Sequence, residues 1–175
     1  CVTNALKHAL ENYSAFRKLF LEEAFKRDNA GNHKQIEVKT RQRVGDSGIP
    51  DLLLIGDLEG EKHVYIVENK LHAKEGKDQT ERYSSEETKQ KIVEMFDLPE
   101  TTRFDFCFLT LYLDQKPQNG KWKKTTHGDI AKAVAERNID AGILSEWYEL
   151  VREFKKEANI ELTSSFLEQM KSSNS

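Results

Sequence analysis

The sequence predicts an α/β fold with a small mixed central sheet of about four or five strands and helices on both faces of the sheet. Three observations predict it. The chain opens with a long amphipathic segment, three strand-like segments follow closely, and the second half alternates helix-like segments with one more apolar strand. Two of the strand-like segments are apolar at successive positions, which is typical of strands covered on both faces. With 175 residues, the chain has the size of one domain spanning residues 1–175.

The first predicted elements are a helix and a strand. Residues 4–27 place apolar side chains three or four positions apart, on one helical stripe, and a break is expected near Asn12. Residues 28–32 have the composition of a loop. Residues 35–44 then alternate between uncharged and charged side chains, so we expect a half-exposed strand with one charged face.

A hairpin is predicted next. Residues 51–57 and 63–69 are rich in Leu, Ile and Val and are joined by a short polar connection, which predicts two antiparallel strands. The two residues at the centre of the connection, Glu59 and Gly60, are expected to form the turn. A turn at these residues fixes the register of the two strands.

That register places two carboxylates opposite one another. Asp51 faces Glu68 directly, with Cβ atoms roughly 4.5–5.5 Å apart, and Lys70 lies on the same face two residues further on. Two acidic side chains in an apolar sheet repel each other and are costly to bury, and a divalent cation between them removes that cost. Carboxylates at this separation suit Mg²⁺. An ammonium group beside the ion can hold the attacking water and offset charge on a phosphorane-like transition state.

The rest of the chain is predicted to add helices and one more strand. Residues 73–96 are polar and free of proline, so we expect a helix there, closed by Pro99. Residues 104–113 have the aromatic and aliphatic density of a strand. Residues 115–126 are expected to form an exposed, lysine-rich loop. Two further helices are expected at residues 129–138 and 144–159.

The charge balance excludes a protein that coats nucleic acid through its overall charge. There are 27 Lys and Arg residues against 30 Asp and Glu residues, for a formal net charge of −3. A contact with nucleic acid therefore needs a local basic surface, and residues 34–43 and 116–124 are the two candidates. We favour the first, because it adjoins the hairpin, and expect it to bind nucleic acid through Lys39, Arg41 and Arg43.

No feature of the sequence points to a membrane or to an oxidising compartment. The longest apolar runs, residues 52–55 and 106–109, are far shorter than the ~20 residues that span a bilayer. Cys1 and Cys107 provide no disulfide framework. We therefore expect a soluble, cytoplasmic protein. Because the chain begins with Cys1 rather than methionine, we also expect it to be a piece of a longer protein.

The pattern of Pro50-Asp51 followed by Glu68-Asn69-Lys70 resembles the motif of the PD-(D/E)XK nuclease superfamily. The resemblance implies that Asp51 and Glu68 ligate the metal, with the backbone carbonyl of Asn69 as a candidate third ligand. It implies that Lys70 positions the nucleophilic water. It also implies a restriction-endonuclease-like fold and covers roughly residues 1–113.

A second motif agrees with the first. Gln79-Thr-Glu-Arg-Tyr83 resembles the Gln-x-x-x-Tyr motif that follows the lysine in one large branch of these nucleases. A spacing of four puts Gln79 and Tyr83 on one helical face. The resemblance implies that Gln79 supports the lysine or touches the nucleic-acid backbone, and that Tyr83 packs beneath the site or contacts a phosphate. Many members also carry a glutamate on the first helix. Here Asn4 stands where a relative has Glu, and Glu11 is the nearest alternative.

The resemblance implies a Mg²⁺-dependent endonuclease or exonuclease that hydrolyses phosphodiester bonds, most readily in DNA, with Mn²⁺ as a substitute for Mg²⁺. Two alternatives stay open: an inactive nuclease fold that binds nucleic acid or scaffolds a larger assembly, and an enzyme that cuts RNA. We expect nucleic acid as the partner, with no membrane contact, in a homodimer or beside further domains of a longer chain. A role in restriction or phage defence is expected.

The histidines and tryptophans show no pattern of their own. His33, His63, His72 and His127 have no spacing that suits a metal, and we expect each at the surface. Trp122 is expected to pack against the protein rather than to stack on bases.

Overall fold

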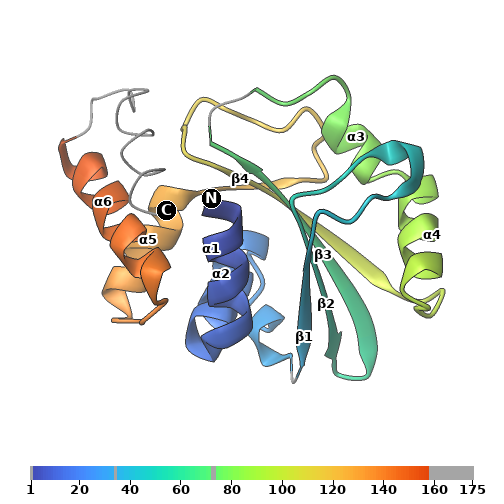
Figure 1. Ribbon diagram of the computed structural model, residues 1–175, viewed down its shortest axis with the longest axis horizontal. Coiled ribbons are helices and arrows are strands. Elements are labelled where there is room, and N and C mark those ends of the chain that lie inside the picture. The colour runs from blue at the N-terminus through green and yellow to red at the C-terminus, as the bar shows by residue number, and fades with distance from the viewer. Residues whose placement is uncertain (1, 34, 72–73, 158–175) are drawn as a thin grey trace.

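A mixed five-stranded sheet with the strand order β1-β2-β3-β4-β5 forms the centre of the molecule (Figure 1). The computed structural model describes residues 2–33, 35–71 and 74–157. β1 pairs with β2 and β2 with β3 in antiparallel fashion, whereas β4 is parallel to β3 and β5 is parallel to β4. The strands are β1 (Ile36–Thr40), β2 (Leu52–Leu58), β3 (Glu61–Lys70), β4 (Arg103–Thr110) and β5 (Lys123–Thr126).

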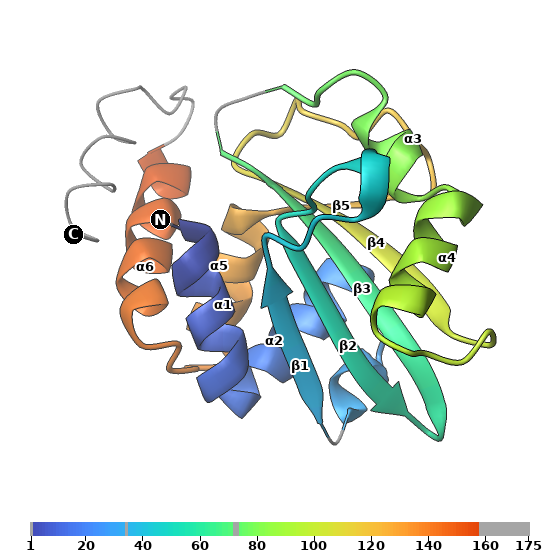
Figure 2. The same ribbon diagram turned by 45° about the vertical axis from the view of Figure 1, so that its right-hand side comes forward.

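Helices cover both faces of the sheet, as Figures 1 and 2 show from two directions. One face carries α1 (Val2–Asn12), α2 (Ser14–Phe25), α5 (His127–Glu136) and α6 (Ile143–Glu157), and the other carries α3 (Gln79–Tyr83) and α4 (Glu86–Met95). Short 3₁₀ turns lie at Ala30–Asn32 and Gly45–Ser47. The predicted α/β fold class, with a mixed sheet between two helical layers, is confirmed.

Each helical layer buries its own apolar cluster against the sheet. Leu54, Tyr65 and Val67 face α1, α2, α5 and α6, whereas Leu53 and Ile66 face α3 and α4. Successive residues of β2 and β3 therefore point to opposite cores, which explains why residues 52–55 and 64–67 are apolar at every position. Within the described part of the chain, no helix has the length and apolar character needed to cross a membrane.

The first helix and strand differ from prediction in their limits. The break expected near Asn12 falls at Tyr13, whose extended backbone (φ −119°, ψ 94°) separates α1 from α2. The strand predicted over residues 35–44 ends at Thr40. Arg41 has a positive φ of 54°, which lies outside the conformation of a strand and ends it.

The single helix predicted over residues 73–96 is wrong, because α3 and α4 occupy part of this segment with a break between them. Asp78, with a left-handed φ of 51°, precedes α3. Ser85 has an extended backbone and begins α4, where its hydroxyl oxygen accepts a bond from the N–H of Thr88 at 3.2 Å. Ala73 lies outside the described residues.

The exposed loop predicted over residues 115–126 is also wrong in part, since its end forms β5. Lys-Lys-Thr-Thr contains no apolar side chain, so its composition gives no strand signal. This segment is a strand because it pairs with β4, with Thr110 opposite Thr126. Trp122, just before β5, is buried and packs as expected.

The hairpin of β2 and β3 confirms the predicted turn and register. Leu58 lies opposite Glu61 and Leu52 opposite Val67, so Glu59 and Gly60 are the two turn residues. Both have positive φ, 52° at Glu59 and 85° at Gly60. This backbone is that of a type I′ turn, which glycine and asparagine adopt with little strain.

We therefore expect Glu59→Asn to raise the free energy of unfolding by about 0.5–1 kcal/mol, because asparagine tolerates positive φ better than glutamate does. Chemical denaturation of both proteins measures the change. Glu59→Val is the matched control and should destabilise, since a β-branched residue resists positive φ. Equal stability of the three proteins would contradict the role assigned to the turn.

Candidate active site

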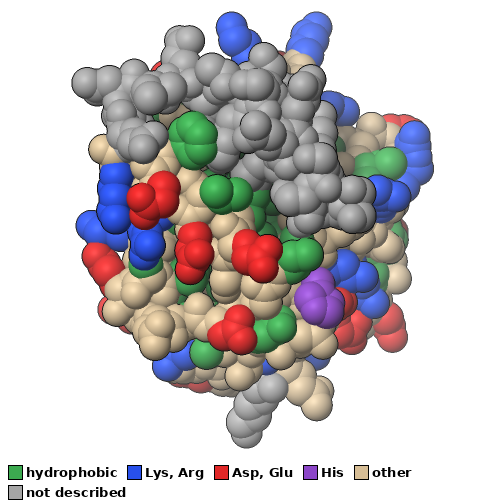
Figure 3. Space-filling view, turned by 60° about the vertical axis from the view of Figure 1, so that its left-hand side comes forward, with side chains coloured by type: hydrophobic (Ala, Val, Ile, Leu, Met, Phe, Trp, Pro, Cys, Tyr) green, Lys and Arg blue, Asp and Glu red, His purple; other side chains and the backbone are tan. Residues whose placement is uncertain are grey.

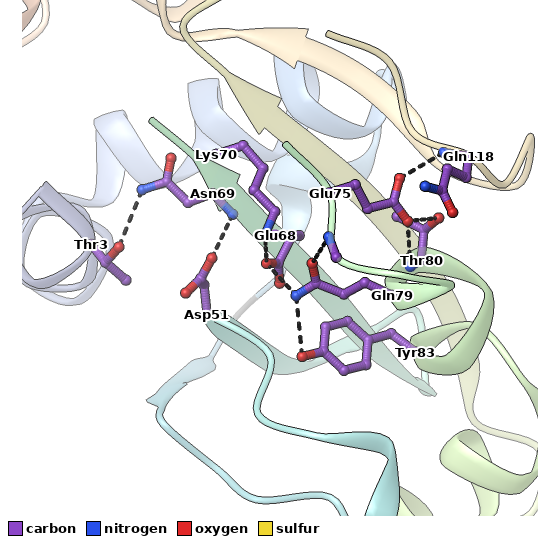
Figure 4. Close-up of polar contacts among 11 residues, drawn as sticks. Thr3, Asp51, Glu68, Asn69, Lys70, Glu75, Gln79, Thr80, Tyr83 and Gln118 are labelled. Carbon is purple, nitrogen blue, oxygen red and sulfur yellow. Dashed lines mark hydrogen bonds and ion pairs between the residues drawn. The ribbon is translucent and has the colours of Figure 1, made fainter. Parts of the chain in front are cut away.

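Two strand ends bring the predicted metal ligands together. The register of β2 and β3, continued one residue beyond Leu52, places Asp51 opposite Glu68. Lys70, at the end of β3, shares the sheet face of Glu68. Figure 4 shows the three side chains gathered where β3 ends, with α3 beside them.

Glu68 is the most enclosed member of the group. Its residue is only 3% exposed. One carboxylate oxygen, Oε1, accepts bonds from Gln79 Nε2 at 2.6 Å and pairs with Lys70 Nζ at 2.9 Å. The other, Oε2, is buried and has no hydrogen-bond partner within the described residues. A buried oxygen without a donor is costly, so this position calls for a ligand that neutralises it.

The two carboxyl groups disturb each other's ionisation. Burial, followed by the nearby charge of Asp51, raises the pKa of Glu68 to about 7, against the opposing effect of Lys70. Burial also raises the pKa of Asp51, while the Asn69 N–H and Lys70 pull it down. Perturbation of this kind, caused by burial and by a like charge, is characteristic of sites where a cation or a reacting group binds.

Asn69 holds Asp51 with its backbone and anchors itself with its side chain. The Asn69 N–H donates to Asp51 Oδ2 at 2.8 Å. On the opposite face of the sheet, its amide contacts Thr3 Oγ1 at 3.2 Å and His127 Nε2 at 2.8 Å. Continued by two residues, the register places Pro50 opposite Asn69. Proline has no N–H, so it cannot donate to the carbonyl of Asn69.

α3 carries the two residues of the second motif to the site. Gln79 contacts Glu68 rather than Lys70, and its Nε2 also donates to the hydroxyl of Tyr83 at 3.4 Å (Figure 4). Tyr83 is 3% exposed and packs beneath the site. Gly48, with φ of 120°, lies against this ring, and a Cβ there would come within 3.0 Å of the Tyr83 hydroxyl. Glycine therefore allows the loop before Asp51 to lie on Tyr83.

The donor set fits a hard divalent cation. Among the residues that the structure describes, no three His, Cys, Asp or Glu side chains come close enough to hold an ion. Asp51 and Glu68 supply two carboxylates at the ends of neighbouring strands. Mg²⁺ binds through one or two carboxylates and keeps several waters, whereas a structural zinc site needs four nitrogen or sulfur ligands. The unpartnered Glu68 Oε2 gives such a cation a place to bind.

The favoured basic segment ends beside the site. Thr40 pairs with Leu52, so Arg41 and Arg43 follow β1 at the Asp51 end of the sheet, and both are exposed. Lys39 lies one residue earlier, where it pairs with Glu37 at 2.9 Å. Lys34 lies outside the described residues.

The other basic segment is partly used for structure. Lys123 Nζ donates to the carbonyl of Phe25, and Lys124 Nζ donates to that of Leu113. The structure describes all four lysines of this segment, and of these only Lys116 and Lys121 are exposed. The segment therefore offers less free positive charge than its sequence suggests.

The first helix approaches the site through Thr3 and not through an acidic residue. Glu11 lies at the opposite end of α1 from Thr3, about 12 Å away at the rise of a helix, and pairs with Lys7 at 3.6 Å. Asn4 is exposed. Neither Asn4 nor Glu11 is placed where it would join Asp51 and Glu68.

The expected surface position of the histidines is wrong for three of them. His33, His63 and His127 are buried, at 8%, 3% and 0% exposure, and His72 lies outside the described residues. His127 contacts Asn69, which lies 58 positions away in the chain, so no local pattern announced it. Burial lowers the pKa of His127 to about 3, which keeps its ring neutral.

Comparison with known proteins identifies the family of the chain. The family model for the PD-(D/E)XK nuclease superfamily matches residues 2–169, a range that includes both carboxylates, the lysine and α3. The curated proteins and the solved structures gave no match. Because the matched range covers nearly the whole sequence, the chain belongs to the PD-(D/E)XK nuclease superfamily.

Proposed function

We propose that this chain is a metal-dependent nuclease that hydrolyses phosphodiester bonds, with DNA as the substrate. The observation that carries the proposal is the buried Glu68 carboxylate, which faces Asp51, pairs with Lys70 at 2.9 Å and keeps one oxygen without a partner. This arrangement joins a cation site to an ammonium group. DNA is proposed because the superfamily includes restriction, repair and phage-defence enzymes, and a restriction or defence role follows as part of the proposal.

Asp51 and Glu68 would hold Mg²⁺, with Mn²⁺ as a substitute, and the Asn69 carbonyl would be a third ligand. When bound, the ion supplies a Lewis acid that polarises the phosphodiester. Because α1 brings no carboxylate to Asp51 and Glu68, the site suits a single ion. The two raised carboxyl pKa values mean that cation binding and proton release are linked.

Lys70 would orient the attacking water and offset the negative charge that develops on the phosphate. Its side chain lies at the end of β3, pairs with the Glu68 carboxylate and is 13% exposed, against 4% for that of Glu68. Gln79 fixes the same Glu68 oxygen that Lys70 contacts, and Tyr83 supports Gln79 from below. These contacts support the proposal that the chain belongs to the Gln-x-x-x-Tyr branch.

Charge on the surface favours an approach of the substrate from the side of Arg41 and Arg43. On α6, Glu146, Glu149 and Glu153 are exposed, and Figure 3 shows acidic side chains gathered on that side of the molecule. A phosphate backbone is repelled there and attracted by the exposed Arg41 and Arg43, which follow β1 at the Asp51 end of the sheet. Lys39, Arg41 and Arg43 are therefore proposed to bind nucleic acid.

We expect Lys70→Ala to lower the rate of plasmid cleavage by about 10²–10⁴-fold, and EDTA to abolish cleavage by the wild type. Supercoiled plasmid, single-stranded DNA and RNA are compared as substrates in Mg²⁺, Mn²⁺ or EDTA. Lys62→Ala is the control, since Lys62 lies on the same strand but pairs with Asp57 at the surface, at 2.8 Å. Cleavage that survives both EDTA and Lys70→Ala would refute the assignment. Binding without cutting in every metal would favour the inactive-fold alternative.

The raised pKa of Glu68 gives a stability test. A folded-state carboxyl with a pKa of about 7 keeps its proton above its ordinary pKa of 4.5. The metal-free protein therefore loses stability as the pH rises between these values, because the unfolded chain releases this proton first. We expect Mg²⁺ to raise Tm more at pH 8 than at pH 5.5. Thermal unfolding with and without Mg²⁺ measures this rise in Tm at each pH. Glu68→Gln should remove most of the difference between the two pH values.

Arg41→Ala with Arg43→Ala should weaken DNA binding and reduce the slope of log Kd against log salt by about 1 for each arginine that contacts a phosphate. Fluorescence anisotropy in EDTA at several salt concentrations measures both quantities. The double variant Lys116→Ala with Lys121→Ala is the matched control, because it removes the same charge from the other basic segment. Equal losses in the two double variants would contradict the proposed surface.

A further inference from the structure

One side chain of the site motif points away from the site. Asn69 stands between Glu68 and Lys70 but faces the helical layer of α1 and α5, where it is 9% exposed. Its Nδ2 donates to Thr3 Oγ1 at 3.2 Å, and its Oδ1 lies 2.8 Å from Nε2 of His127. Because the amide nitrogen donates to Thr3, the amide oxygen is the acceptor and the Nε2–H of His127 is the donor.

His127 is fully buried and is held rigidly. It is the first residue of α5, whose capping box joins Thr126 and Asp129 through bonds of 3.1 and 3.0 Å. Its ring meets that of Trp147 edge-on, with 4.4 Å between centroids. Within the described residues its Nδ1 has no hydrogen-bond partner. Burying an imidazole for one bond is costly, so that bond to Asn69 is the feature that needs an explanation.

The backbone of Asn69 links the two carboxylates of the site. Its N–H binds Asp51 Oδ2 at 2.8 Å, and Glu68 directly precedes it in the chain. Toward β2, however, the residue opposite Asn69 is Pro50, which cannot complete an antiparallel pair because it has no N–H. On this side the peptide therefore lacks a bond that would normally fix a strand. The bonds to Thr3 and His127 fix the same residue from the other face of the sheet.

We propose that His127 is a positioning residue of the metal site, acting through Asn69 to set the Asp51 carboxylate against that of Glu68. The inference rests on the function proposed above. Thr3 is the second anchor of the Asn69 amide. Without His127, the Asn69 peptide and the Asp51 carboxylate that it binds are free to reorient, and a cation then has to order its ligands as it binds.

Binding of Mn²⁺ to the full chain, without nucleic acid, tests the inference directly. The free ion is counted by its electron paramagnetic resonance signal. We expect His127→Ala to weaken Mn²⁺ binding by about 10–100-fold, the range typical for residues that orient metal ligands. His127→Gln keeps an N–H donor and should recover most of the loss. Thr3→Val, which removes the other anchor at a partly exposed position, should weaken binding in the same direction.

His33→Ala is the matched control. His33 is a buried histidine, 8% exposed, whose Nε2 lies 2.6 Å from the Tyr65 hydroxyl. It packs against Gly56 on β2, five residues from Asp51 and so about 17 Å away along the strand. Its removal should lower Tm as much as His127→Ala does, yet leave Mn²⁺ affinity unchanged.

The outcomes separate the inference from the proposed function. Weaker Mn²⁺ binding in His127→Ala and Thr3→Val, with recovery in His127→Gln, supports the positioning role. Should His127→Ala not fold, Thr3→Val decides: weaker Mn²⁺ binding supports the inference, and wild-type affinity overturns it. Wild-type Mn²⁺ affinity in a folded His127→Ala also overturns it while leaving the nuclease proposal intact. A wild-type protein that binds no Mn²⁺ and cuts no substrate contradicts the proposed function itself and the inference with it.

Discussion

Two carboxylates held opposite each other in an apolar sheet determine how the rest of the site is arranged. Asp51 and Glu68 face each other because the turn at Glu59 and Gly60 fixes the register of β2 and β3. Burial raises the pKa of both carboxyl groups, and repulsion by the charge of Asp51 raises that of Glu68 further. The pair is stable only if other groups or a cation offset that repulsion, and the surrounding contacts are arranged accordingly.

These contacts come from both faces of the sheet. On the site face, Lys70 and Gln79 share one oxygen of Glu68, and the other oxygen is left without a partner in the described structure. On the opposite face, His127 holds Asn69, whose N–H binds Asp51. Helices on both sides are therefore needed for the site, because one layer supplies α3 and the other supplies α5. The fold and the chemistry are linked at the end of β3.

The sequence predicted those parts whose signal is local. The hairpin and its register followed from two turn residues and a period of two, and a helix over residues 73–96 was expected to carry Gln79 and Tyr83 on one face. The break between α3 and α4 in that segment was not predicted. β5 was not predicted, because Lys-Lys-Thr-Thr has no apolar residue and pairs only through the sheet. His127 was wrongly expected at the surface. Its burial depends on a bond to Asn69, 58 positions away in the chain, which the local sequence does not reveal. Contacts of this kind depend on packing that no local pattern encodes.

The proposed chemistry requires that Asp51 and Glu68 together bind a cation. A crystal structure of the wild-type chain grown with Mn²⁺, with anomalous scattering recorded to locate the ion, tests this most directly. We expect one ion bonded to a carboxylate oxygen of each residue, with Glu68 Oε2 among its ligands. An anomalous map without a peak between the two side chains, at Mn²⁺ concentrations that support cleavage, would contradict it.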